Sequence, residues 1–368
     1  MRSPMTRRAA VLVGAFLLIP VVASPAVTAE GTAAGERVIL ERVDRYRVVE
    51  PLFECVRVVL SYRGETYSPG YVQGVSGAAF RIGGPCPCAP TCEWAMSTDR
   101  LIHLLGYEYE RLGVPAEGPE REPAMQRMLA RIKDEIRAGR PALLWHIFTA
   151  CENDVVAGFD DGKHVLYGRG SYAGLEAYAE ANEMRPLEAT AGCGGPHAIL
   201  IGEKTGSFDA RAAELDALEG AVLHARGASA ARGFAGPVGL QCYDQWIASY
   251  RAYSSKFGVL AANSPTDGYV LSILSSTRRA ASEFMRELAP KHPDAAAHLE
   301  MAAEHFARES AALQACHKVG ADGPQKPTED QCLRSAAYLS DARAMYALAI
   351  EEIARALRIM EPVAWELP

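Results

Sequence analysis

The chain has 368 residues, with 38 Lys and Arg against 45 Asp and Glu, which gives a net charge of −7 at pH 7. A net acidic chain without a basic cluster argues against nucleic acid as a partner. The length favours two domains, because a domain averages roughly 150 residues.

The N-terminus has the pattern of a removable secretory signal peptide at residues 1–29. Arginines precede an apolar run at residues 9–23, and small residues ending in Ala29 follow it. The apolar run is shorter than the roughly 20 residues that a membrane span needs, and no later segment is apolar enough. An uncleaved anchor is the alternative to removal. We therefore expect a secreted or periplasmic protein with no membrane span after cleavage.

The sequence contains nine cysteines, and in an oxidising compartment their expected state is the disulfide. An odd number leaves at least one thiol unpaired within the monomer. The nine are Cys55, Cys86, Cys88, Cys92, Cys151, Cys193, Cys242, Cys316 and Cys332.

Cys86, Cys88 and Cys92 form a close cluster with two interpretations. The first is a disulfide-tied loop in which two of them bond to Cys151 and Cys193. The second is a soft metal ion, zinc or copper(I), with Cys151 or Cys193 as the fourth ligand. Export favours the disulfides, and the spacing is not that of a standard zinc motif. We therefore expect no metal and no cofactor.

The composition changes near residue 205, from strand-like runs between glycine-rich turns to an Ala-, Glu- and Arg-rich helical pattern. Helices followed by gathered strands favour an α+β arrangement in the first part. The predicted helices there are 52–62 and 125–138, each ending on a glycine, and the predicted strands are 142–148, 154–159, 164–167 and 197–202. The second part predicts helices at 209–225, 240–253, 269–288, 294–317 and 330–360.

A disulfide between Cys316 and Cys332 follows from their spacing. The Gly- and Pro-rich segment 319–327 cannot continue a helix, and Thr328 offers an N-cap for the next one. The two cysteines then lie at the same height of an antiparallel helix pair, within the reach of a disulfide. The alternative is two unrelated thiols on different helix faces.

Several segments of the first part resemble papain-like proteins of the bacteriocin leader peptidase type, and more closely the N-terminal domain of the butirosin acyltransferase BtrH group. The resemblance rests on the order and spacing of PLFECVRVVLSYRG (51–64), YVQGVSGAAFR (71–81), GRPALLWHIF (139–148) and VVAGFDDGKHVLYGRGS (155–171). It covers roughly residues 36–205. It implies a papain-like domain at residues 30–205 after the signal peptide, followed by a helical domain at residues 206–368.

The resemblance also implies a cysteine at the start of the first helix and a histidine at the start of the strand that ends in Gly-Phe-Asp. A helix N-terminus and an imidazole together activate such a thiol. Counting back from Gly64 and from Gly158 places these two positions at Pro51 and Glu152. We therefore expect an exported pseudoenzyme that binds a peptide or a small acyl-type ligand without cysteine catalysis.

Two other functions stay open. Cys55 and His197 could rebuild a dyad, with Asp154 or Asp160 orienting the imidazole, and would make the protein a cysteine peptidase, amidase or acyltransferase. We favour instead that Cys55 packs as a small apolar residue and that His197 forms a hydrogen bond at a strand edge. The third possibility is a metal-binding protein built on the cysteine cluster.

Overall fold

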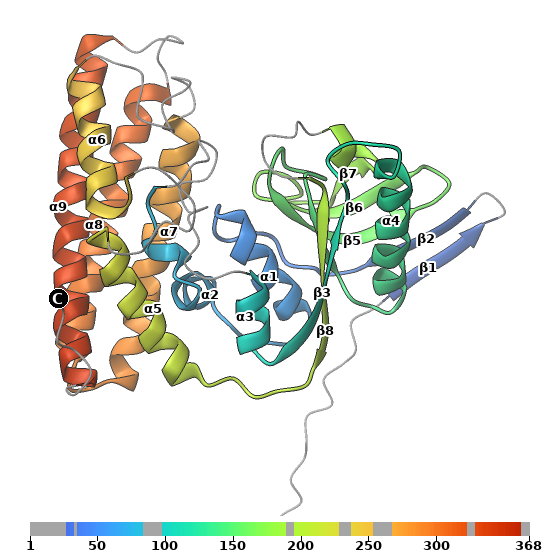
Figure 1. Cartoon of the computed structure of the whole chain (residues 1–368), viewed down its shortest axis with the longest axis horizontal. Coiled ribbons are helices and arrows are strands. Elements are labelled where there is room, and N and C mark those ends of the chain that lie inside the picture. The colour runs from blue at the N-terminus through green and yellow to red at the C-terminus, as the bar shows by residue number, and fades with distance from the viewer. Residues whose placement is uncertain are drawn as a thin grey trace, which may run out of the picture.

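The computed structural model describes residues 27–32, 35–83, 98–188, 195–227, 237–252, 267–321 and 328–361. In this part of the chain, an antiparallel sheet with flanking helices stands beside a layer of long helices (Figure 1). The expected combination of helices with gathered strands is thereby confirmed at the level of α-helices and an antiparallel sheet.

The sheet has the strand order β1-β2-β5-β4-β8-β3, and β6 joins β5 to β7. Neighbouring strands are antiparallel throughout the described residues. The bounds are β1 Val27–Thr32, β2 Gly35–Leu40, β3 Tyr107–Gly113, β4 Ala142–Trp145, β5 Asn153–Asp160, β6 Val165–Arg169, β7 Ala179–Asn182 and β8 His197–Lys204.

Helices cover both faces of the centre of the sheet (Figure 1), so β4 and nearly all of β5 are buried on both sides. Strands of this kind read as continuous apolar runs, which is why the sequence predicted them. The helices of the first part are α1 Pro51–Tyr62, α2 Pro69–Val75, η1 Ala78–Phe80, α3 Thr98–Leu104, α4 Arg121–Arg137 and η2 Arg185–Glu188.

The second part consists of long helices in which α8 packs against both α7 and α9. Their bounds are α5 Ala210–Ala225, α6 Gly239–Arg251, α7 Asp267–Leu288, η5 Ala289–Lys291, α8 Ala296–Ala321 and α9 Glu329–Met360. The predicted N-cap, Thr328, forms a capping box with Gln331 at the start of α9. None of the helices in the described part of the chain combines the length and the apolarity needed to cross a membrane.

The segment of α2 and η1 precedes the predicted boundary at residue 205, yet it packs against α7 and α5. A Cβ atom on Gly74 of α2 would come within 2.1 Å of the Phe284 ring of α7, so this contact requires a glycine. The Tyr346 hydroxyl of α9 donates to the Phe80 carbonyl at 2.9 Å. One cluster of buried apolar side chains therefore extends over both sides of residue 205. The boundary itself stays a prediction.

Several predictions concern residues outside the described ranges. Residues 1–26 of the expected signal peptide lie outside them, and a cleavage after Ala29 would divide β1. The cysteine cluster at residues 86–92 and Cys193 also lie outside, so its disulfides stay predictions. In the described residues, no group of three His, Cys, Asp or Glu side chains is arranged to hold a metal ion.

Cys316 and Cys332 are both buried, on the neighbouring helices α8 and α9. The Cys316 Sγ lies 3.8 Å from the carbonyl oxygen of Ser335. The disulfide between the two cysteines stays a prediction.

Candidate functional site

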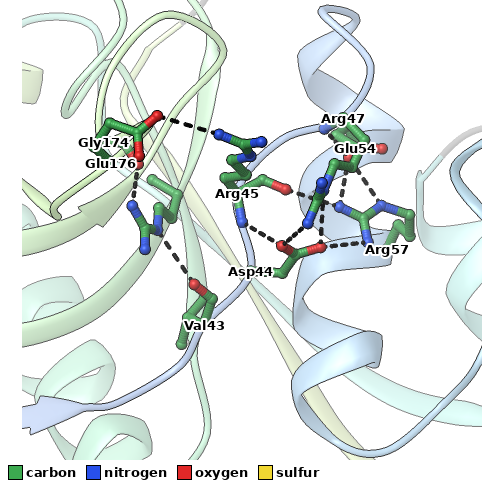
Figure 2. Close-up of polar contacts among 9 residues, drawn as sticks. Val43, Asp44, Arg45, Arg47, Glu54, Arg57, Gly174 and Glu176 are labelled. Atoms are coloured by element: carbon green, nitrogen blue, oxygen red, sulfur yellow. Dashed lines mark hydrogen bonds and ion pairs between the residues drawn. The ribbon is translucent and has the colours of Figure 1, made fainter.

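A network of charged side chains fixes the segment that leads from β2 into α1 (Figure 2). The guanidinium of Arg57 is almost fully buried and pairs with Glu54 at 2.6 Å and with Asp44 at 3.2 Å. It also donates to the carbonyl of Arg45 at 3.0 Å, and the Arg47 amide donates to Glu54 at 2.6 Å. Because a bidentate buried guanidinium holds its partners in one geometry, the network sets the direction in which the chain enters α1.

A second set of contacts ties the same segment to the loop after β6 (Figure 2). Arg169 donates to the Val43 carbonyl at 3.2 Å and also to the Gly174 carbonyl. The exposed pair between Arg45 and Glu176, at 3.3 Å, adds little stability because water screens it. The entry to α1 is thus held from the sheet as well as from the helix.

At the N-terminus of α1, the Glu50 carboxylate occupies the helix cap. It accepts the amide hydrogens of Leu52 at 3.1 Å and Phe53 at 3.0 Å, and the side-chain amide of Gln73 at 3.0 Å. Pro51 follows as the first residue of the helix. Burial raises the pKa of Glu50, while the three hydrogen bonds act in the opposite direction. The amides that could stabilise a thiolate at this helix end are therefore engaged by a carboxyl group.

Glu152 lies directly before β5, where the resemblance implies a histidine. It is buried, and it accepts a hydrogen bond from the Tyr269 hydroxyl at 2.5 Å. Burial, followed by the charge of Glu152, raises the pKa of Tyr269. The Tyr269 ring lies against Tyr172, with centroids 5.6 Å apart. Tyr269 of α7 thus contacts the side chain at the expected histidine position, and the sequence alone did not indicate this contact.

Cys55 lies inside α1 and is fully buried. Its thiol donates to the carbonyl of Leu52 at 2.9 Å. Burial, followed by the charges of Glu50 and Asp154, raises the pKa of Cys55 well above its usual value. A reactive cysteine needs a lowered pKa and access to solvent, and Cys55 has neither.

His197 is the first residue of β8. Its Nδ1 is 3.2 Å from the Gly195 carbonyl oxygen, and its ring stacks on Trp145 with the two ring centroids 6.0 Å apart. In the described residues, no hydrogen bond or ion pair joins His197 to Cys55 or to Asp154. The structure therefore does not assemble the alternative dyad.

The two aspartates considered for that dyad have other partners. Asp154 is fully buried and accepts the amide hydrogens of Phe148 at 2.7 Å and Thr149 at 2.8 Å. Burial raises its pKa to about 7. Asp160 lies 3.8 Å from the guanidinium of Arg37. Asp154 thus shapes the loop before β5, and Asp160 belongs to the far end of that strand.

The loop between β4 and β5 carries local backbone strain. His146 and Cys151 have φ angles of 64° and 59°, which residues other than glycine rarely adopt. The amide of Cys151 donates to Nδ1 of His146 at 2.6 Å and holds the loop in this form. The turn at His146 also ends β4 at Trp145, three residues before the predicted end of the strand.

A scan against models of known protein families found no match, and a search of curated proteins found none either.

Proposed function

We propose that this protein is a papain-like binding protein that recognises a peptide or a small acyl-type ligand without cysteine catalysis. The observation that carries the proposal is the Glu50 carboxyl group at the N-terminus of α1. In a cysteine enzyme of this kind, that helix end stabilises the nucleophilic thiolate. In this chain it is capped by a carboxyl group and followed by Pro51, which has no nucleophilic atom.

The arrangement of α1 and the sheet supports a papain-like scaffold. α1 packs across β4 and β5, and the position before β5 lies close to the helix entry, as the charges acting on Tyr269 from Glu152 and Glu50 indicate. Pro51 and Glu152 stand where the resemblance implies the thiol and the imidazole, and neither side chain can act as the nucleophile and base of a cysteine enzyme, which supports binding without an acyl-enzyme.

A ligand has polar and aromatic groups to contact beside this pair. Tyr172 is about half exposed (48%) and lies on Tyr269, at the junction between the sheet and α7. An exposed tyrosine on a fixed neighbour offers both contact area and a hydroxyl at low entropic cost. We therefore place ligand recognition at this junction.

The proposal is tested by incubating the full chain with a panel of peptide, amide and thioester substrates, beside the variant Cys55→Ala. We expect no turnover that depends on Cys55, together with saturable peptide or acyl-ligand binding that Tyr172→Ala weakens. Iodoacetamide should leave Cys55 unmodified in the native protein and modify it after denaturation. Turnover that disappears in a folded Cys55→Ala variant would instead establish the cysteine enzyme.

A further inference from the structure

A cavity of about 280 Å³ lies between α7, α8 and the segment that enters α1. Its volume is at the lower limit of ordinary ligand pockets, which span roughly 300–1,000 Å³. The described residues that line it are Val49, Ser272, Ser275, Ser276, Arg279, Gln314, His317 and Lys318. The cavity thus suits one small polar group rather than a whole drug-sized molecule.

Helical spacing gathers the polar residues at this place. Ser272, Ser276 and Arg279 recur at intervals of four and three on α7, so they share one face. Gln314 and His317 are three apart on α8 and face them across the helix pair. The Ser310 hydroxyl donates to the Ser275 carbonyl at 2.7 Å and holds the two helices together behind the cavity.

The charge of the lining is positive or neutral. Arg279, His317 and Lys318 contribute basic groups, and the described lining contains no Asp or Glu. In the part of the chain that the structure describes, none of the three has an ion-pair partner. Basic residues without acidic partners around a cavity, in a chain of net charge −7, concentrate positive potential at this point.

The hydroxyl groups add donors directed by the fold. Ser276 is buried, and its oxygen accepts the Val49 amide hydrogen at 3.0 Å. The Ser272 oxygen lies 3.5 Å from the Tyr172 hydroxyl. The Ser276 oxygen serves as an acceptor, and no acceptor for its hydroxyl hydrogen is found among the described residues. The Ser272 and Tyr172 hydroxyls can each donate to the other. The Ser276 hydrogen is therefore available to an acceptor in the cavity.

From this convergence of two basic helix faces and the Ser276 hydroxyl, we infer that the cavity binds an oxyanion, the carboxylate or phosphate group of a small ligand. An oxyanion accepts several hydrogen bonds at once, and its bonds to a guanidinium are charge-assisted. The inference rests on the proposed function, because Tyr172, Tyr269 and Ser272 connect the cavity to the junction where we place the ligand. It adds that the ligand is anionic at one end.

The test is isothermal titration calorimetry of the full chain with inorganic phosphate, sulfate and acetate, at constant ionic strength in chloride. We expect saturable binding, weakened about tenfold or more by Arg279→Gln and by Lys318→Met, because each change removes a charge-assisted contact. Both side chains are exposed, so the fold should be retained, which circular dichroism checks. The matched control is Arg286→Gln, which removes an exposed arginine of the same helix outside the cavity and should bind like the wild type.

The preferred anion identifies the ligand group. Tighter binding of phosphate or sulfate indicates a phosphate ester, and tighter binding of acetate indicates a carboxylate such as a peptide C-terminus. The inference is overturned when no anion binds saturably to the wild type, or when Arg286→Gln weakens binding as much as Arg279→Gln does. These results leave the proposed absence of catalysis untouched, because that is measured separately on Cys55.

Discussion

Replacing Arg278 should cost more stability than any other single change to a charged residue of the helical layer. Arg278 and Glu309 are both fully buried, and their charged groups lie 2.7 Å apart. The guanidinium also donates to the carbonyls of Ala79 at 2.6 Å and Arg81 at 3.0 Å. One side chain thus satisfies a buried charge in α8 and two backbone oxygens, one within η1 and one directly after it.

The variant Arg278→Met keeps an unbranched side chain that ends where the guanidinium begins, and it removes these contacts. Glu309 then remains buried, with only the Tyr243 hydroxyl as a donor among its described partners, at 2.6 Å. Breaking a buried ion pair from one side costs about 3–5 kcal/mol. Domains have unfolding free energies of roughly 5–15 kcal/mol, so this change removes a large fraction of the stability.

Urea-induced unfolding, followed by circular dichroism and by tryptophan fluorescence, measures the loss, and the two signals should coincide if unfolding is two-state. Arg279→Met, the matched change at the neighbouring exposed arginine, should alter the unfolding free energy by less than about 0.5 kcal/mol. The double variant Arg278→Met/Glu309→Leu should recover part of the loss, because it removes both charges. A loss below about 1 kcal/mol in the single variant, or no recovery in the double variant, would refute the reasoning.

Three further outcomes are expected. Burial raises the pKa of Asp154 from 3.8 to about 7, so the contribution of this group to the unfolding free energy is fully present below pH 3.8 and falls by about 4 kcal/mol as the pH rises through 7. Urea unfolding at several pH values should show that Asp154→Asn reduces the pH dependence of the unfolding free energy, and an unchanged pH dependence would contradict this. Mass spectrometry of non-reduced peptides from protein purified under oxidising conditions should find Cys316 linked to Cys332, and an alkylated thiol at either position would reject the link. Gly74→Ala should lower the unfolding free energy by about 1–3 kcal/mol through overpacking, whereas Gly113→Ala, which meets no atom within 4 Å, should change it little.

The elements that the sequence predicted are those whose residues carry a strong local signal. α1 ends where Gly64 permits a φ of 90°, and α9 begins at the Thr328 cap. The strands β1, β2, β3 and β7 were missed. β3 lies at the edge of the sheet and is largely exposed, with Glu108, Glu110 and Arg111 on it. Charged residues protect such an edge from pairing, and they also remove the apolar alternation that reveals a strand.

Only the part of the candidate site that has a local sequence signal could be predicted. Counting from glycines placed the two expected dyad positions at Pro51 and Glu152, because the spacing within one element is a local property. Tyr269 could not be found in this way, since it lies more than 100 residues from Glu152 along the chain and reaches it only through the packing of α7. The cavity near Tyr269 also could not be predicted, because no local sequence pattern indicates that Ser276 of α7 and His317 of α8 line the same cavity.

The chemistry at the entry to α1 depends on Glu50 as well as on the residue at position 51, and this dependence can be measured. In a Pro51→Cys variant, the new thiol would lie beside a carboxyl group that already accepts the amides of Leu52 and Phe53. Negative charge nearby raises a thiol pKa, and engaged amides cannot lower it. In Glu50→Ser/Pro51→Cys, the charge is absent and a smaller cap leaves one amide available, so the thiol pKa should fall below that of the single variant. The pH dependence of the iodoacetamide rate gives both values, with Cys55 as the buried internal reference. Equal values would show that Glu50 has no influence on this position, and the argument that its carboxyl group excludes a thiolate would then be wrong.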